Sequence, residues 1–188
     1  QSYRGRLKQP LKRLMASGIV APLMRSAHIK EGLAMKIWFD TEFIEDGKTI
    51  DLISIGMVRE DGETLYLENS ECNISRAVPW VKENVLCHLL GKGSSRESIA
   101  QSVLEFAGSS PEFWAYYADY DWVVLCQLYG AMMDLPKGWP MYCRDIKQEI
   151  DRAGNPRIPF KPDTAHNALS DAIWTKDAHE FINQILAD

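Results

Sequence analysis

Two acidic residues early in the patterned part of the chain could bind a divalent metal ion. Asp40 and Glu42 follow the apolar, β-forming run Ile37-Trp38-Phe39, so we expect them at the end of a central strand. Residues two apart in a strand point to one face, where two carboxylates repel each other unless a cation lies between them. Hard oxygen ligands favour Mg²⁺ or Mn²⁺. The alternative is a strand end whose acids are solvated or salt-bridged.

A third carboxylate follows the aromatic stretch 112–117, which we predict to be a strand. Asp121 stands at the start of an amphipathic helix, and strand ends are where open α/β sheets place their sites. Asp119 is the competing candidate, and we prefer Asp121 because the helix follows it directly. The alternative is that Asp121 serves only as the helix N-cap.

His166 and Asp171 could complete such a site. On a regular helix, residues five apart diverge by roughly 140°. Both can therefore face one centre only if His166 lies just before the helix or in its first loose turn. Otherwise His166 is a surface residue and Asp171 a solvated helix acid.

Four acids and one histidine are the minimum set for two-metal hydrolysis of a phosphodiester. Two cations about 3.5–4 Å apart hold the attacking water and the leaving oxygen. A histidine is suited to taking the water's proton near neutral pH.

The elements that must position these residues follow an α/β pattern. We predict strands at 36–43, 50–58, 64–67, 112–117 and 141–143. We predict helices at 75–89, 98–106, from about 121 to 132, at 146–153 and at 168–186. Short turns connect the first three strands, so these pair antiparallel, and the later strands alternate with helices. The pattern predicts a mixed central sheet with helices packed on it.

Composition and cysteine usage are those of an ordinary globular protein. The 188 residues are 46% hydrophobic and 25% charged, and no apolar run is long enough to span a membrane. No signal peptide of the usual pattern is present. The four cysteines form no CxxC pair, which favours reduced thiols and a cytoplasmic location over a disulfide framework or a zinc site.

The net charge of −5 is unevenly distributed. Residues 1–34 carry seven basic groups and one acid, so the rest of the chain carries −11. An acidic body does not hold duplex nucleic acid by charge alone, whereas it suits a catalytic body whose acids bind metal. We expect 1–34 to be a basic extension, upstream or vector-derived, and 35–188 to be the catalytic domain. An RNA-binding arm and a targeting presequence are the alternatives for 1–34.

Three motifs resemble those of the DEDDh 3′–5′ exonucleases, in the ribonuclease H-like superfamily. They are Asp40-Thr41-Glu42, Tyr120-Asp121 and His166-x-Ala168-x-x-Asp171. A histidine in the third motif, where other branches have tyrosine, is typical of the DEDDh branch. Three longer stretches, at 40–47, 52–56 and 125–128, resemble the mycobacterial-type exoribonuclease AS group. The resemblance covers about residues 35–186 and implies a ribonuclease H-like α/β fold with helices on both faces of the sheet.

The resemblance also implies a role for each residue of the set. Asp40 would bridge two metal ions, Glu42 and Asp171 would hold the metal that activates water, and Asp121 would support the second metal. His166 would be the general base.

Two further residues are implied to contact substrate. Thr41 and Phe43 would do so, with Phe43 stacking on the terminal base; the alternative for Phe43 is a core aromatic. Tyr117 stands where many relatives have asparagine, which leaves the choice between Asp119 and Asp121 open.

The implied activity is that of a 3′–5′ exoribonuclease. It would use two Mg²⁺ or Mn²⁺ ions, act on single-stranded RNA 3′ ends with a preference for poly(A)-like adenylate, release 5′-monophosphates and form a homodimer. One alternative is a 3′–5′ DNA exonuclease for proofreading or trimming, because such sites serve both sugars. The other is a catalytically silent nucleic-acid-binding module, against which the intact set of five residues argues. No membrane partner is expected.

Overall fold

The computed structural model describes residues 34–159 and 166–187, which belong to one compact unit spanning 33–188. The basic segment, apart from Ala34, lies outside the described residues, so the prediction for 1–34 stays a prediction. None of the described helices is long and apolar enough to cross a membrane.

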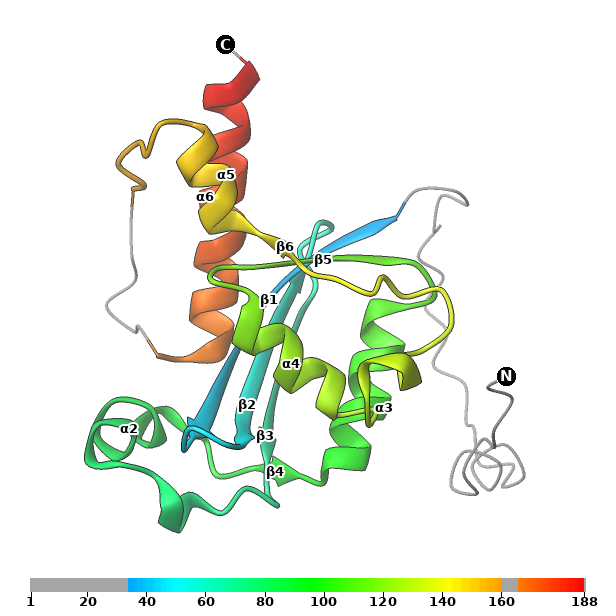
Figure 1. Ribbon diagram of the computed structural model, residues 1–188, viewed down its shortest axis with the longest axis vertical. Coiled ribbons are helices and arrows are strands. Elements are labelled where there is room, and N and C mark those ends of the chain that lie inside the picture. Colours follow the sequence, from blue (N-terminus) through cyan, green and yellow to red (C-terminus); the bar gives the residue numbers. More distant parts are fainter. Residues whose placement is uncertain (1–33, 160–165, 188) are drawn as a thin grey trace. The chain divides into compact units, whose positions relative to one another are not determined.

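The described strands form one mixed sheet of six (Figure 1). They are β1 Met35–Glu45, β2 Ile50–Arg59, β3 Thr64–Asn69, β4 Gly93–Ser94, β5 Pro111–Ala115 and β6 Arg144–Asp145. Their order in the sheet is β4-β3-β2-β1-β5-β6. β2 pairs antiparallel with both β1 and β3, whereas β5 pairs parallel with β1 and β6, and β4 with β3. The mixed α/β sheet predicted from the sequence is confirmed.

Helices cover both faces of the sheet, as expected (Figure 1). The α-helices are α2 Pro79–Asn84, α3 Arg96–Ala107, α4 Asp119–Gln127, α5 Ile146–Arg152 and α6 Ala168–Ala187. The described part of the chain also has three short 3₁₀ turns, η1 Ile74–Arg76, η2 Leu86–His88 and η3 Met132–Asp134. α3 and α4 share a core cluster with Ile37 and Phe39 of β1, whereas α5 and α6 share one with Trp38.

The alternation along β1 decides where its two acids point. Ile37 and Phe39 belong to the core under α3 and α4, and Trp38 to the core under α6. Asp40 and Glu42 continue the Trp38 face, because side chains alternate along a strand. The pairing of β1 with β2 shifts only after Glu42, so both acids precede the irregularity.

The single helix predicted at 75–89 is wrong. The segment is broken into η1, α2 and η2, and the side chain of Asn73 caps η1 by accepting a hydrogen bond from the backbone N–H of Ser75. Proline lacks an N–H and pushes the residue before it out of the helical region. Val78 is accordingly extended, and the helix begins at Pro79.

Two boundaries near the later strands also differ from the prediction. The strand predicted at 141–143 is wrong, because β6 comprises Arg144–Asp145. The helix predicted to begin at Asp121 begins at Asp119, with Ala118 as its N-cap residue. Asp121 is therefore in the first turn of α4 and is not its N-cap. The two-residue strand β4 had no counterpart in the prediction.

Candidate active site

Three of the predicted residues converge at the N-terminal end of α6. Glu42 comes from β1, whereas His166 and Asp171 come from the start of α6 and the residues before it. One carboxylate oxygen each of Glu42 and Asp171 and one ring nitrogen of His166 all lie within 4.8 Å of one another. Two carboxylates and an imidazole at this spacing form a donor set that a single cation could reach.

The backbone of His166 has the unusual geometry that the five-residue spacing demands. Its φ is +71°, in the left-handed region, and α6 begins two residues later at Ala168. Its N–H donates to Oδ2 of Asp171 over 2.7 Å. The expectation that His166 precedes the helix is therefore confirmed. Asp171 holds the backbone of His166 in addition to contributing its own carboxylate.

A glycine on β2 allows α6 to approach the sheet at this point. Gly56 is the partner of Asp40 in the β1–β2 pairing. A Cβ atom on Gly56 would lie 2.2 Å from the nitrogen of Leu169 and 2.3–2.4 Å from the carbonyl carbon and oxygen of Ala168. These distances are far inside van der Waals contact, so the absence of a side chain at Gly56 sets how closely the first turn of α6 packs on β2.

Asp121 is hydrogen-bonded to Thr41, the residue of β1 that lies between Asp40 and Glu42. It is 6% exposed, and its Oδ1 accepts hydrogen bonds from the backbone N–H of Thr41 at 2.8 Å and from the Thr41 hydroxyl at 2.5 Å. Burial raises the pKa of the Asp121 carboxyl to about 7; the bonds from Thr41 oppose the rise, and Asp145 adds to it. A buried carboxyl with such a pKa is a candidate for a functional group.

The raised pKa predicts how the metal-free protein responds to pH. Between pH of about 4 and 7 the folded state keeps a proton on Asp121 that the unfolded chain has lost, so the free energy of unfolding falls as pH rises. The loss is at most about 4 kcal/mol. Asp121→Asn should flatten this slope, because asparagine can still accept from Thr41 without carrying a charge. Urea unfolding in EDTA at pH 5, 6, 7 and 8 measures the difference between variant and wild type.

Asp119→Asn is the matched control for this prediction, because Asp119 is an exposed acid in the same helix turn. It should leave the slope unchanged. A slope that survives in Asp121→Asn would show that another group carries the proton.

The structure distinguishes the two candidates for the third carboxylate. Asp119 is exposed, whereas Asp121 is buried against Thr41. Tyr117, which stands where many relatives have asparagine, precedes both acids. Its φ is +56°, a left-handed conformation that asparagine adopts more readily than tyrosine. The backbone at Tyr117 thus has the conformation that an asparagine would favour. The N–H of Tyr117 donates a hydrogen bond to Oδ1 of Asp145 at 3.1 Å, which helps to hold this conformation.

The two residues predicted to contact substrate have protein partners. Thr41 is buried, and its hydroxyl is donated to Asp121. The ring of Phe43 stacks on that of Tyr120, with 5.8 Å between centroids and 11° between planes. Tyr120 is half-exposed, so Phe43 and Tyr120 form a paired aromatic surface. Substrate contact by Thr41 and Phe43 stays a prediction.

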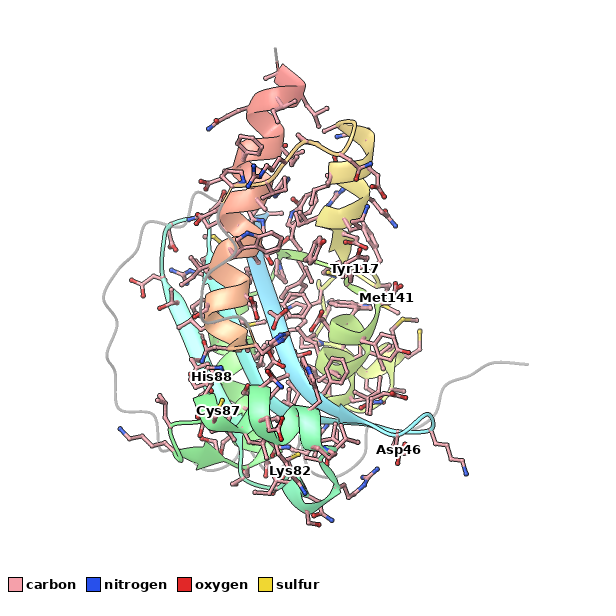
Figure 2. All side chains as sticks on the ribbon, turned by 90° about the vertical axis from the view of Figure 1, so that its left-hand side faces the viewer. Asp46, Lys82, Cys87, His88, Tyr117 and Met141 are labelled. Carbon is pink, nitrogen blue, oxygen red and sulfur yellow. The ribbon has the colours of Figure 1, made fainter. Side chains whose placement is uncertain are left out.

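One aromatic neighbour of the cluster was missed in the sequence. Trp80 of α2 lies edge-to-face against His166, with 4.7 Å between ring centroids. In both views the N-terminal end of α6 lies next to α2, on which Lys82 is labelled in Figure 2. No motif in the sequence marks Trp80, and its contact with His166 is visible only in the fold.

Comparison of the sequence with known proteins assigns the chain to a family. Residues 35–183 match the model of the 3′–5′ exoribonuclease Rv2179c-like domain. The chain belongs to this family. Among curated proteins, it is 43% identical over 146 residues to 3′–5′ exoribonuclease Rv2179c of Mycobacterium tuberculosis strain H37Rv, covering 73% of this chain and 87% of that protein. The same figures hold for 3′–5′ exoribonuclease MT2234.1 of strain CDC 1551.

The match to the Rv2179c-like family includes all the elements of the candidate site. Its range of 35–183 contains β1, α2, the first turn of α4 and the first turn of α6. The residues that the fold brings together therefore all lie within the family domain.

Proposed function

We propose that this chain removes nucleotides one at a time from the 3′ ends of single-stranded RNA by two-metal phosphodiester hydrolysis, releasing 5′-monophosphates. Membership of the Rv2179c-like 3′–5′ exoribonuclease family supports the activity. The observation that carries the chemistry is the convergence of Glu42, His166 and Asp171 within 4.8 Å.

The donor set fits Mg²⁺ or Mn²⁺. Glu42 and Asp171 offer carboxylate oxygens, which these hard cations prefer. Asp40 lies on the same face of β1 as Glu42, and Asp121 is tied to the residue between them. We assign Asp40, Glu42 and Asp171 to one centre, with Asp40 and Asp121 serving a second. The cations would supply charge stabilisation for the attacking and leaving oxygens.

The protein's own groups would orient the reaction. His166 would accept the proton of the attacking water, a task suited to imidazole near neutral pH. Asp171 would hold His166 through the backbone hydrogen bond while its carboxylate faces the same centre. Thr41 would hold Asp121 by two hydrogen bonds, which fixes that carboxylate against β1.

His166→Ala should slow the chemical step by about 10²–10⁴-fold, the usual contribution of a positioned general base. Metal binding should persist, because Glu42 and Asp171 remain. Single-turnover hydrolysis of a 5′-labelled RNA measures the rate, and the shift of the melting temperature with Mn²⁺ measures metal binding. His88→Ala is the matched control, because His88 belongs to η2 and is not part of the group of Glu42, His166 and Asp171. An unchanged single-turnover rate in His166→Ala would remove the base role.

The finer features of the proposal rest on the resemblance. Preference for adenylate, assembly as a homodimer and a cytoplasmic location are inferred from it and from the cysteine usage. The Phe43–Tyr120 pair is a candidate surface for the terminal base, because aromatic stacking tolerates any base. It does not by itself select adenine.

A time course on 5′-labelled single-stranded RNA and DNA, with Mg²⁺, Mn²⁺ or EDTA, tests the proposal. We expect a ladder shortening by one nucleotide from the 3′ end of RNA, absent in EDTA. A-tailed, U-tailed and C-tailed RNA in the same experiment test base preference. Faster loss of DNA would favour a DNA exonuclease, and binding without hydrolysis would favour a silent module.

A further inference from the structure

Trp80 is neither a buried core residue nor a member of the group of Glu42, His166 and Asp171. It is 52% exposed, although tryptophan is a residue that folding usually covers. Its ring nevertheless meets the His166 ring at 4.7 Å with an interplanar angle of 79°. An edge-to-face contact of this kind is attractive and depends on the orientation of both rings.

The helix that carries Trp80 is fixed to the strand that carries Glu42. A core cluster joins Ile44 of β1 and Ile53 of β2 to Ala77 and Val85, with Val81 of α2 packed against it. Ile44 is two residues beyond Glu42 in β1. α2 is therefore anchored near the part of β1 that carries Glu42, and its Trp80 contacts the ring of His166.

The contacts of His166 divide between its backbone and its ring. Asp171 accepts the backbone N–H and so fixes where the residue sits. That bond leaves the side-chain torsions of His166 to be set by other contacts. The ring contact with Trp80 restricts those torsions, and in the observed orientation a ring nitrogen lies within 4.8 Å of the Glu42 and Asp171 carboxylates.

We propose that Trp80 is a positioning residue that holds the His166 imidazole in its catalytic orientation. The proposal rests on the proposed function of His166 as general base. Loss of the Trp80 ring leaves the metal-binding carboxylates in place and lets the imidazole sample other rotamers. Catalysis then falls by the fraction of time that the imidazole is misplaced.

The test is a double-mutant cycle on the single-turnover rate of RNA hydrolysis, measured with enzyme in saturating excess over the labelled RNA. Trp80→Ala should lower the rate about 3- to 10-fold, the factor that an aromatic pair contributes. Trp80→Phe should restore most of it, because phenylalanine keeps an aromatic face. In the His166→Ala background, Trp80→Ala should have no further effect, since the group that it positions is gone.

Val81→Ala is the matched structural control, because it weakens the packing of α2 without removing a ring from His166. A rate loss in Val81→Ala equal to that of Trp80→Ala would overturn the proposal in favour of simple destabilisation. A loss that persists in the His166→Ala background, or that disappears when the enzyme is saturating, would overturn it in favour of direct substrate stacking by Trp80.

An NMR measurement separates failure of this proposal from failure of the proposed function. The ring protons of His166 should shift when Trp80 is replaced by leucine, whether or not the protein hydrolyses RNA. A wild-type protein inactive on RNA would refute the proposed function. If the wild-type protein hydrolyses RNA, and replacing Trp80 changes neither the His166 resonances nor the rate, the positioning role alone would be refuted.

Discussion

Asp171→Asn should reduce RNA hydrolysis by about 10³-fold or more while the fold persists, because a metal centre contributes several kcal/mol to the transition state. Asparagine keeps an oxygen that can accept the His166 N–H now bonded to Asp171 at 2.7 Å. The substitution therefore preserves the loop and removes the charge that would hold a cation beside Glu42. Initial rates over a Mn²⁺ titration measure the loss, and melting temperatures with and without Mn²⁺ measure the weakened binding.

Asp177→Asn is the control, because Asp177 is an exposed acid on the same helix, further from its start. It should leave both the rate and the Mn²⁺ response unchanged. Near-normal activity in Asp171→Asn would mean that the cluster of Glu42, His166 and Asp171 is not the metal centre. An equal loss in both variants would point to the net charge of α6 rather than to a site.

Gly56→Ala should reduce hydrolysis about 10²-fold without touching any residue of the proposed chemistry. The added Cβ would lie 2.2–2.4 Å from backbone atoms of Ala168 and Leu169. Backbone atoms cannot rotate away as a side chain can, so the first turn of α6 must move by about 1 Å to reach ordinary contact. Such a displacement carries Asp171 and the bound His166 away from Glu42, and misplacement of this size can cost about 10²-fold in rate.

The same substitution should lower the free energy of unfolding by about 1–3 kcal/mol, the usual cost of overpacking. Ile182→Val separates the two effects, because Ile182 packs the far part of α6 in the core shared with Trp38. It should cost about 0.5–1.5 kcal/mol while sparing activity. Wild-type activity in Gly56→Ala would show that the close approach of α6 to β2 is not needed for catalysis.

Local patterns were sufficient to predict most elements and the backbone geometry around the candidate site. Alternation along β1 predicts that Asp40 and Glu42 share one face, because a strand allows only two side-chain directions. In the structure Ile37 and Phe39 belong to one core and Trp38 to the other, and Glu42 meets His166 and Asp171. The five-residue spacing required His166 to precede α6, and its left-handed backbone meets that requirement. These inferences depend on backbone geometry over a few residues, which the sequence carries directly.

Elements without a strong local pattern were misplaced. β6 is two residues long and exists because β5 offers a free edge at Trp114 and Ala115. The break at Pro79 could have been predicted from the proline itself, because a proline favours an extended residue before it, although the prediction placed one helix across it. Short elements and interrupted helices are decided by the partners they find, and those partners are distant in the chain.

The type of sheet, the faces of β1 and the resemblance to an exoribonuclease family can all be predicted from the sequence, because each follows from local periodicity or motif identity. Which acid of the second motif is buried depends on the fold, since Thr41 and Asp121 are 80 residues apart in the chain and meet only when it folds. The close packing of α6 on β2 at Gly56 and the contact between Trp80 and His166 likewise depend on the fold. Such contacts arise when whole elements pack together. Rules based on the spacing of nearby residues cannot predict the distances between them.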